Sequence, residues 1–177
     1  MTLHQLGTHH QTDKATHHHY LGLYDLLFHR VRRRTVSVLE IGVQFGNSLR
    51  TWKDYFPFGT IIGIDTVDNG VEKEPGIDIL IGNAYTHEMI GKLRNKQFDI
   101  IIDDGSHDSL DQVWFVGNYS PLLSRDGILI VEDVLMPATT GVLCKALPEK
   151  LDYVAVEMTE GASQVDSRLF IAWKRYD

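Results

Sequence analysis

The chain has 177 residues, 43% of them hydrophobic and 23% charged, which is the composition of an ordinary globular protein with a sizeable core. Its net charge of −7 argues against a nucleic-acid partner, because a polyanion binds to a basic surface. The single cysteine, Cys144, excludes an internal disulfide and a thiolate zinc site, and no apolar run approaches the roughly 18 residues of a membrane span. The histidine-rich N-terminus lacks the features of a signal peptide, so we expect a cytoplasmic protein that does not associate with a membrane.

The first half of the chain predicts an arm followed by alternating helices and strands. Residues 1–19 are polar without periodicity, which predicts an irregular arm, whereas apolar residues recur at helical spacing from Tyr20 to Val31. Runs of branched apolar residues predict strands, and amphipathic segments predict helices, in the following order: a strand over 36–41, a helix over 48–56 capped by Asn47, a strand over 60–64, a loop over 66–76, a strand over 77–81 and a helix over 85–93.

The second half repeats this alternation and then breaks it. It predicts a strand over 98–102, a helix over 108–123, a strand over 127–131, a short helix over 139–147 and two last strands over 151–156 and 168–173. Parallel strands need crossover helices, whereas the last two strands can pair as an antiparallel hairpin. We therefore expect one α/β domain over residues 1–177, with a doubly wound, mostly parallel seven-stranded sheet, and with residues 1–34 covering the site.

The turn after the first predicted strand contains two glycines, Gly42 and Gly46, followed by Ser48. Glycines let the backbone approach a ligand, and the next helix offers free N–H groups at its start. The spacing differs from the G-x-G-x-x-G of dinucleotide sites, and the Glu40 carboxylate would repel a pyrophosphate. Asp65, which ends the second strand, is placed to accept ribose hydroxyls. The pattern favours S-adenosylmethionine over NAD, and a plain tight turn remains the alternative.

Carboxylates also end the fourth and fifth predicted strands. Asp104 follows one strand, and Glu132 and Asp133 follow the next. Because the carboxyl ends of parallel strands meet at one edge, we expect these acids to lie together, at a high cost unless a cation joins them. Oxygen ligands without a thiol indicate magnesium or a similar divalent ion, and His107 is then a candidate general base. The simpler alternative is that the acids cap helices and face water separately.

Several of these residues resemble the motifs of a known family. E-x-G-x-x-x-G over residues 40–46 resembles motif I of class I S-adenosylmethionine methyltransferases, in which the position of Gln44 is often glycine. D-G-S-H over residues 104–107 and E-D at 132–133 resemble the magnesium-dependent sugar O-methyltransferases of macrolide and related antibiotic pathways. They are also similar to catechol-type O-methyltransferases, in which a lysine stands at the place of His107.

The N-terminal T-D-K of residues 12–14, with Tyr20 and Tyr24 after it, resembles a segment that covers cofactor and substrate in the sugar enzymes. Carried over residue by residue, the resemblance implies three sets of roles: Asp104, Glu132 and Asp133 as metal ligands; His107 as base; and Lys14, Tyr20, Glu40, Gly42, Gly46, Ser48, Asp65, Asn83 and Ala84 at the cofactor.

The resemblance implies an S-adenosylmethionine-dependent O-methyltransferase in which a divalent metal binds and activates a hydroxyl group. The implied acceptor is a small molecule, a sugar or glycosylated natural product, with a catechol as a further possibility and its identity left open. A homo-oligomer in which a partner subunit completes the pocket is also left open. Two alternatives stand beside this interpretation: an NAD-linked Rossmann oxidoreductase, and a non-catalytic module that binds S-adenosylmethionine.

Overall fold

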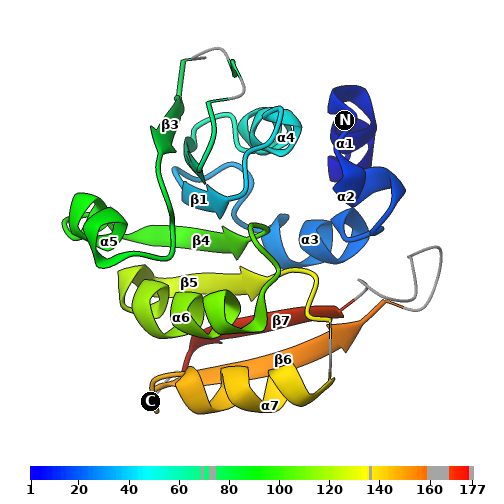
Figure 1. Cartoon of the computed structure of the whole chain (residues 1–177). Helices are drawn as coiled ribbons and strands as arrows, with labels where there is room; N and C mark the ends of the chain where they lie inside the picture. Colours follow the sequence, from blue (N-terminus) through cyan, green and yellow to red (C-terminus); the bar gives the residue numbers. More distant parts are fainter. Residues whose placement is uncertain (69, 72–74, 136, 159–167, 176–177) are drawn as a thin grey trace.

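A sheet with the strand order β3-β2-β1-β4-β5-β7-β6 organises the protein (Figure 1). The structure, a computed structural model, describes residues 1–68, 70–71, 75–135, 137–158 and 168–175. The first five strands pair in parallel, and β7 runs antiparallel to both β5 and β6. The strands are β1 (Ser37–Ile41), β2 (Thr60–Asp65), β3 (Ile77–Ile81), β4 (Phe98–Asp103), β5 (Leu123–Val131), β6 (Leu151–Glu157) and β7 (Arg168–Lys174).

Helices cover both faces of the sheet. One core lies between the sheet and α1, α3 and α4, and a second lies between the sheet and α5, α6 and α7. The helices are α1 (Leu3–His10), α2 (Asp13–Thr16), α3 (Leu21–Phe28), α4 (Asn47–Tyr55), α5 (His87–Leu93), α6 (Ser109–Tyr119), the 3-10 helix η1 (Ser120–Leu122) and α7 (Pro137–Ala146). The predicted doubly wound, mostly parallel sheet with an antiparallel C-terminal pair is thus confirmed.

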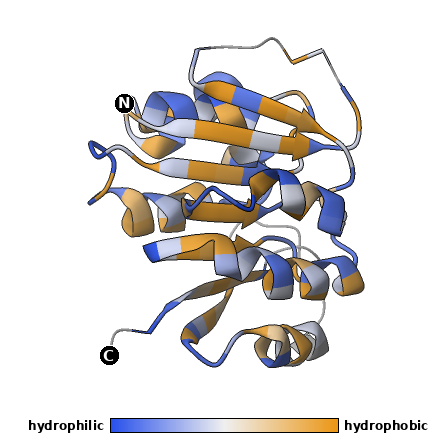
Figure 2. Ribbon diagram, turned by 90° about the vertical axis from the view of Figure 1, so that its left-hand side faces the viewer, coloured by the Kyte–Doolittle hydropathy of each residue, from blue (hydrophilic) through white to orange (hydrophobic). Residues whose placement is uncertain are grey.

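The central strands are apolar on both faces because each face is covered by helices. In β4, Ile100 and Ile102 pack into the first core, while Ile101 packs into the second. Figure 2 shows the consequence, since the middle strands are coloured hydrophobic along most of their length. The strands predicted from branched apolar runs were found for this reason.

The predicted irregular arm over residues 1–19 is wrong, because α1 and α2 form there. Thr2 and Gln5 make a reciprocal capping box, and Leu3 and Leu6 are buried. Two apolar residues in a polar segment are too few to produce a visible period. The predicted cap Asn47 is the first residue of α4 instead, after Gly46.

Smaller differences concern the ends of elements. The predicted helix over 108–123 ends at Tyr119 and continues as η1, which contains Pro121, and β5 begins at Leu123 rather than at 127. Part of the predicted loop over 66–76 lies outside the described residues. Over the part of the chain that is described, no helix is long and apolar enough to cross a membrane.

The N-terminal helices α2 and α3 lie beyond the arrowheads of β4 and β5 (Figure 1). This placement brings the first 30 residues against the carboxyl ends of the central strands, where the topology of an open α/β sheet places ligands.

Candidate active site

Carboxylates gather where β1, β4 and β5 end. We call them the acidic edge: Glu40, Asp103, Asp104, Glu132 and Asp133. Parallel pairing places Asp103 beside Ile41 on one side and Val131 on the other, and the Glu132 N–H donates to the Asp103 carbonyl oxygen at 2.9 Å. Acids from three separate strands therefore become neighbours, and the strand-end pattern predicted this for β4 and β5 but not for Glu40 on β1.

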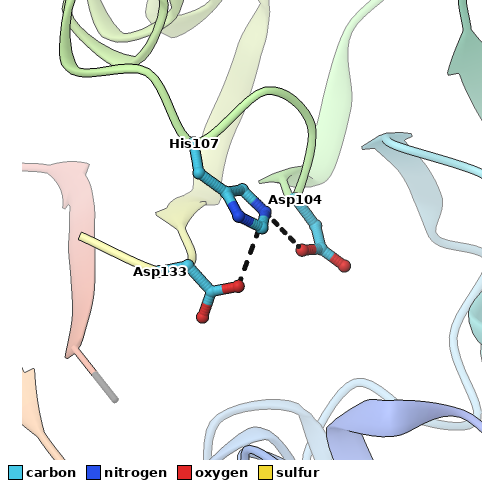
Figure 3. A group of neighbouring side chains, drawn as sticks. All are labelled: Asp104, His107 and Asp133. Atoms are coloured by element: carbon cyan, nitrogen blue, oxygen red, sulfur yellow. Dashed lines mark hydrogen bonds and ion pairs between the residues drawn. The ribbon is translucent and has the colours of Figure 1, made fainter. Parts of the chain in front are cut away.

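Asp104, His107 and Asp133 form a group whose ligand atoms lie close enough together to hold a metal ion (Figure 3). His107 Nε2 lies 3.2 Å from Asp104 Oδ1 and 3.4 Å from Asp133 Oδ2, and one ligand atom of each residue lies within 4.8 Å of the others. His107 and Asp133 have φ angles of 57° and 53°. Residues other than glycine rarely adopt this left-handed backbone conformation, and it persists where the surrounding structure enforces it. The structure thus brings together two predicted ligands and the predicted base.

The charges around His107 suit proton transfer. Its hydrogen bond with Asp104 raises the pKa of His107, which exceeds the opposing effect of burial, and the Asp133 charge adds to the rise. At Asp104 burial raises the pKa, but the Lys14 ammonium and the His107 hydrogen bond outweigh burial and lower it. Asp104 is therefore ionised, and it orients an imidazole whose raised pKa makes it a stronger proton acceptor.

Lys14 enters the acidic edge from α2 and is 1% exposed. Its Nζ donates to Asp104 Oδ2 and, at 2.9 Å, to Glu132 Oε2, and it lies 3.4 Å from Glu40 Oε1. Burial lowers the pKa of Lys14, but attraction to these three carboxylates outweighs burial and raises it well above the ordinary value. Lys14 is therefore a buried cation among the acids. It was predicted at the cofactor, and it does not line the cavity described below.

Glu132 lies outside the three-residue metal group. Its Oε1 accepts a hydrogen bond from the Tyr24 hydroxyl at 2.6 Å, and its Oε2 accepts from Lys14. Tyr20, predicted at the cofactor, instead donates its hydroxyl to Asp133 Oδ1 at 2.6 Å. The metal role of Glu132 stays a prediction, and the structure shows how α3 fixes both members of the E-D pair.

A cavity of about 690 Å³ opens beside the acidic edge. Its walls come from the β1–α4 turn, the ends of β2 and β3, the 104–107 loop and the α1–α2 junction. The cavity is lined by several of the predicted cofactor residues: Gly42, Ser48, Asp65, Asn83 and Ala84. Because Asp104 and His107 line the same cavity, a ligand held by the glycine turn would meet the metal group.

Two other predicted cofactor residues, Glu40 and Gly46, lie outside the lining. Glu40 is fully buried and accepts a 2.7 Å hydrogen bond from the Trp52 indole N–H. Asp65 lines the cavity, but its carboxylate already accepts hydrogen bonds from the backbone N–H groups of Val43, Gln44 and Val67. Burial raises the pKa of Asp65, but these backbone bonds outweigh burial and lower it. The contact of Asp65 with a ribose stays a prediction. In the structure, the Asp65 carboxylate stabilises the glycine turn through these hydrogen bonds.

The residues present fit a divalent ion. Asp104 and Asp133 offer carboxylate oxygens, which suit a hard divalent cation, and the predicted base His107 lies beside them. Lys14 alone does not balance the charge of the acidic edge: burial raises the pKa of Glu40 and of Asp103 to about 7, and it raises the pKa of Asp133 as well. An additional cation beside Lys14 would offset this cost.

The cavity also fits a nucleoside-sized ligand with a polar end. Helix α4 begins after Gly46 without a side-chain cap, so the N–H groups of its first turn are not satisfied by a capping side chain. Asn47 and Ser48 of this turn line the cavity.

Some residues that the sequence did not identify hold the acidic edge in place through hydrogen bonds. The Tyr85 hydroxyl donates to Asp103 Oδ1 at 2.7 Å and accepts the Ser106 N–H at 3.0 Å. Gln112, 1% exposed on α6, donates to the Glu132 carbonyl oxygen at 3.0 Å. A polar residue on the inward face of a helix was the available signal for Gln112, whereas Tyr85 gave none.

The strand order, with an antiparallel β7 between β5 and β6, is the fold of the class I methyltransferases; the parallel dinucleotide-binding order 3-2-1-4-5-6 lacks that strand. No model of a known protein family matches the chain. Among solved structures, the chain is similar to the MycE methyltransferase of the mycinamycin biosynthetic pathway in complex with Mg, SAH and mycinamycin VI. The match has a TM-score of 0.81 and 26% identity, and it covers 98% of this chain and 54% of that one.

The curated homologues of the chain are sugar O-methyltransferases of antibiotic pathways. It is 34% identical over 138 residues to 8-demethyl-8-alpha-L-rhamnosyl tetracenomycin-C 2'-O-methyltransferase of Streptomyces olivaceus, a match that covers 73% of this chain and 36% of the relative. It is 33% identical over 126 residues to mycinamicin VI 2''-O-methyltransferase of Micromonospora griseorubida, covering 66% of this chain and 32% of the relative. The chain thus spans only about a third of the length of these relatives.

Proposed function

We propose that the protein is an S-adenosylmethionine-dependent O-methyltransferase that uses a divalent metal to bind and activate a hydroxyl of a sugar or glycosylated natural product. The observation that carries this proposal is the convergence of Asp104, His107 and Asp133 on the cavity of the glycine turn. Two comparisons support the proposal. Proteins named as sugar O-methyltransferases match the chain, and the similar protein MycE was solved with Mg and SAH.

The roles of the side chains follow from their contacts. When bound, a divalent ion would lower the pKa of an acceptor hydroxyl and fix its orientation. Asp104 and Asp133 would hold the ion, with Glu132 as a further ligand. His107 donates its Nε2–H to Asp104, so it would take up the hydroxyl proton at its other ring nitrogen, Nδ1. The cavity holds the methyl donor next to His107, so the acceptor oxygen and the methyl group meet at short range, which supplies much of the rate.

The test is methyl transfer from labelled S-adenosylmethionine to a panel of small acceptors with free vicinal hydroxyls, both sugars and catechols, in the presence of Mg²⁺. We expect turnover with glycosylated acceptors, loss of turnover on addition of chelator, and no reaction that depends on NAD. Binding of S-adenosylhomocysteine without turnover on any acceptor would instead support the non-catalytic alternative.

His107→Ala separates a base from a metal ligand. A base should lose turnover by about a hundredfold or more while the Kd for Mn²⁺, measured by electron paramagnetic resonance, stays near the wild-type value. Loss of Mn²⁺ binding together with turnover would make His107 a ligand and contradict the base assignment. The matched control is His29→Ala, an exposed histidine at the end of α3.

A further inference from the structure

The N-terminal segment forms one wall of the cavity and ends in the acidic edge. Gln11, Thr12 and Asp13, at the α1–α2 junction, line the cavity, and we call them the N-terminal wall. The next residue, Lys14, turns away from the cavity into the protein and is 1% exposed. The N-terminal wall is therefore one peptide bond away from Lys14, whose ammonium group contacts the acidic edge.

The Lys14 ammonium connects this segment to three strands at once. It contacts Glu40 on β1, Asp104 after β4 and Glu132 after β5. Asp104 is shared between the two sites, because its Oδ2 accepts from Lys14 and its Oδ1 faces His107 at 3.2 Å. Any movement of the N-terminal segment would then leave buried carboxylates without their cation, which is strongly unfavourable.

Other anchors of the segment lie elsewhere. Leu3 and Leu6 bury α1 in the first core, and the exposed pair of His10 Nε2 and Asp54 Oδ2, at 2.8 Å, ties α1 to α4. These anchors hold the helix before the wall. After the wall, the Tyr20 N–H donates to the Lys14 carbonyl oxygen at 3.1 Å, so the path of the chain toward α3 depends on where Lys14 sits.

We propose that Lys14 is a positioning residue that fixes the N-terminal wall against the acidic edge and so completes the cofactor cavity. It acts through its partners, since it does not line the cavity itself. The identity of the ligand in the cavity rests on the proposed function, whereas the anchoring of the wall does not.

The test compares the full-length wild type with Lys14→Met, which keeps an unbranched side chain of similar size and removes its charge, and Lys14→Arg, which keeps the charge. His10→Ala is the matched control, because it removes the contact with Asp54 from the same segment without touching the acidic edge. Hydrogen exchange of residues 11–20 is followed by mass spectrometry without metal or cofactor, and the Kd for S-adenosylhomocysteine is measured by calorimetry.

For Lys14→Met we expect exchange at residues 11–20, which include the N-terminal wall, to accelerate at least about tenfold, with β4 and β5 still protected, and the Kd to rise at least about tenfold. His10→Ala should change neither, and Lys14→Arg should lie closer to the wild type than Lys14→Met. A residue that only fills space would show the reverse order, since methionine replaces the shape of lysine better than arginine does.

Unchanged exchange in Lys14→Met would overturn the anchoring, and an unchanged Kd would overturn the link to the cavity. If the wild type binds no S-adenosylhomocysteine, the proposed function fails, and exchange still decides the role of Lys14. Should Lys14→Met not fold, the same comparison is made in a Glu132→Gln background, which removes one of the carboxylates left without a cation.

Discussion

Replacing Gly42 by alanine should damage both the fold and the metal group, because this residue touches the backbone of Asp104. Gly42 has a φ of 91°, a conformation that side chains rarely adopt. A Cβ at this position would collide with the Asp104 carbonyl oxygen, and it would lie 2.7 Å from the Asp104 carbonyl carbon and 3.2 Å from Gly105 Cα. These are backbone atoms, so no side-chain rotation relieves the contact.

The expected cost has two parts. Holding a residue with a Cβ at this φ costs about 1–3 kcal/mol, and forcing extra volume into a packed site costs about 1–3 kcal/mol more. A loss of about 2–6 kcal/mol is a large part of the roughly 5–15 kcal/mol that stabilises a typical domain. With a urea dependence of about 2 kcal/mol/M, the unfolding midpoint should fall by about 1–3 M.

Urea unfolding followed by circular dichroism measures this shift, and Mn²⁺ titration of the folded variant should show weaker binding, because the Asp104 peptide has to move. Gly91→Ala is the control: Gly91 lies in α5 with no atom within 4 Å of an added Cβ, so this change should stabilise the protein by about 0.5–1 kcal/mol. A Gly42→Ala midpoint within about 0.5 M of the wild type would refute the argument.

Three further predictions follow from single contacts. Gln44→Gly should raise the free energy of unfolding by about 0.5–1 kcal/mol, because Gln44 has a φ of 48° in a turn position that suits glycine; an unchanged or lower melting temperature would contradict this. Tyr24→Phe should lower stability by about 1–3 kcal/mol in thermal unfolding, because buried Glu132 loses a 2.6 Å hydrogen bond, and a neutral result would show that water replaces the hydroxyl. Burial raises the pKa of Asp103 to about 7, so the folded state keeps a proton that the unfolded state loses above about pH 4, and stability should fall as pH rises from 4 to 7. With chelator present, Asp103→Asn should remove about 2.5 kcal/mol of that decline between urea titrations at pH 5 and pH 8, because about two pH units of the shift lie in this window, and an unaltered decline would refute the shift.

The sheet could be predicted because its strands are buried on both faces. Ile77–Ile81 was predicted with the bounds that the structure has, and the 98–102 strand differs by one residue. The acidic edge followed from topology alone: once parallel order is assumed, acids that end β4 and β5 have to meet, and Asp104 and Asp133 do. The local sequence pattern and the assumption of parallel pairing were therefore enough to predict most of the fold and about half of the site.

The N-terminal contacts could not be predicted in the same way. Lys14 and Glu132 are 118 positions apart, and nothing in the local pattern of T-D-K shows that the lysine is buried. The burial of Leu3 and Leu6 depends on α4, a partner that the first 20 residues do not reveal. The first residues were therefore assigned to an irregular arm, although they form helices, of which α1 packs against α3 and α4.

The need for a cation was the strongest physical argument available from the sequence, and the fold answers it in two ways. Lys14 supplies a permanent positive charge on the side of Glu40 and Glu132, while Asp104, His107 and Asp133 keep ligand atoms on the other side. Asp104 belongs to both arrangements through its two oxygens. An argument from charge alone predicts at least one cation at this edge. It cannot show whether that cation is a lysine from a distant segment of the chain or a metal ion. The positions of the carboxylate oxygens distinguish a lysine from a metal ion, and they are compatible with the presence of both.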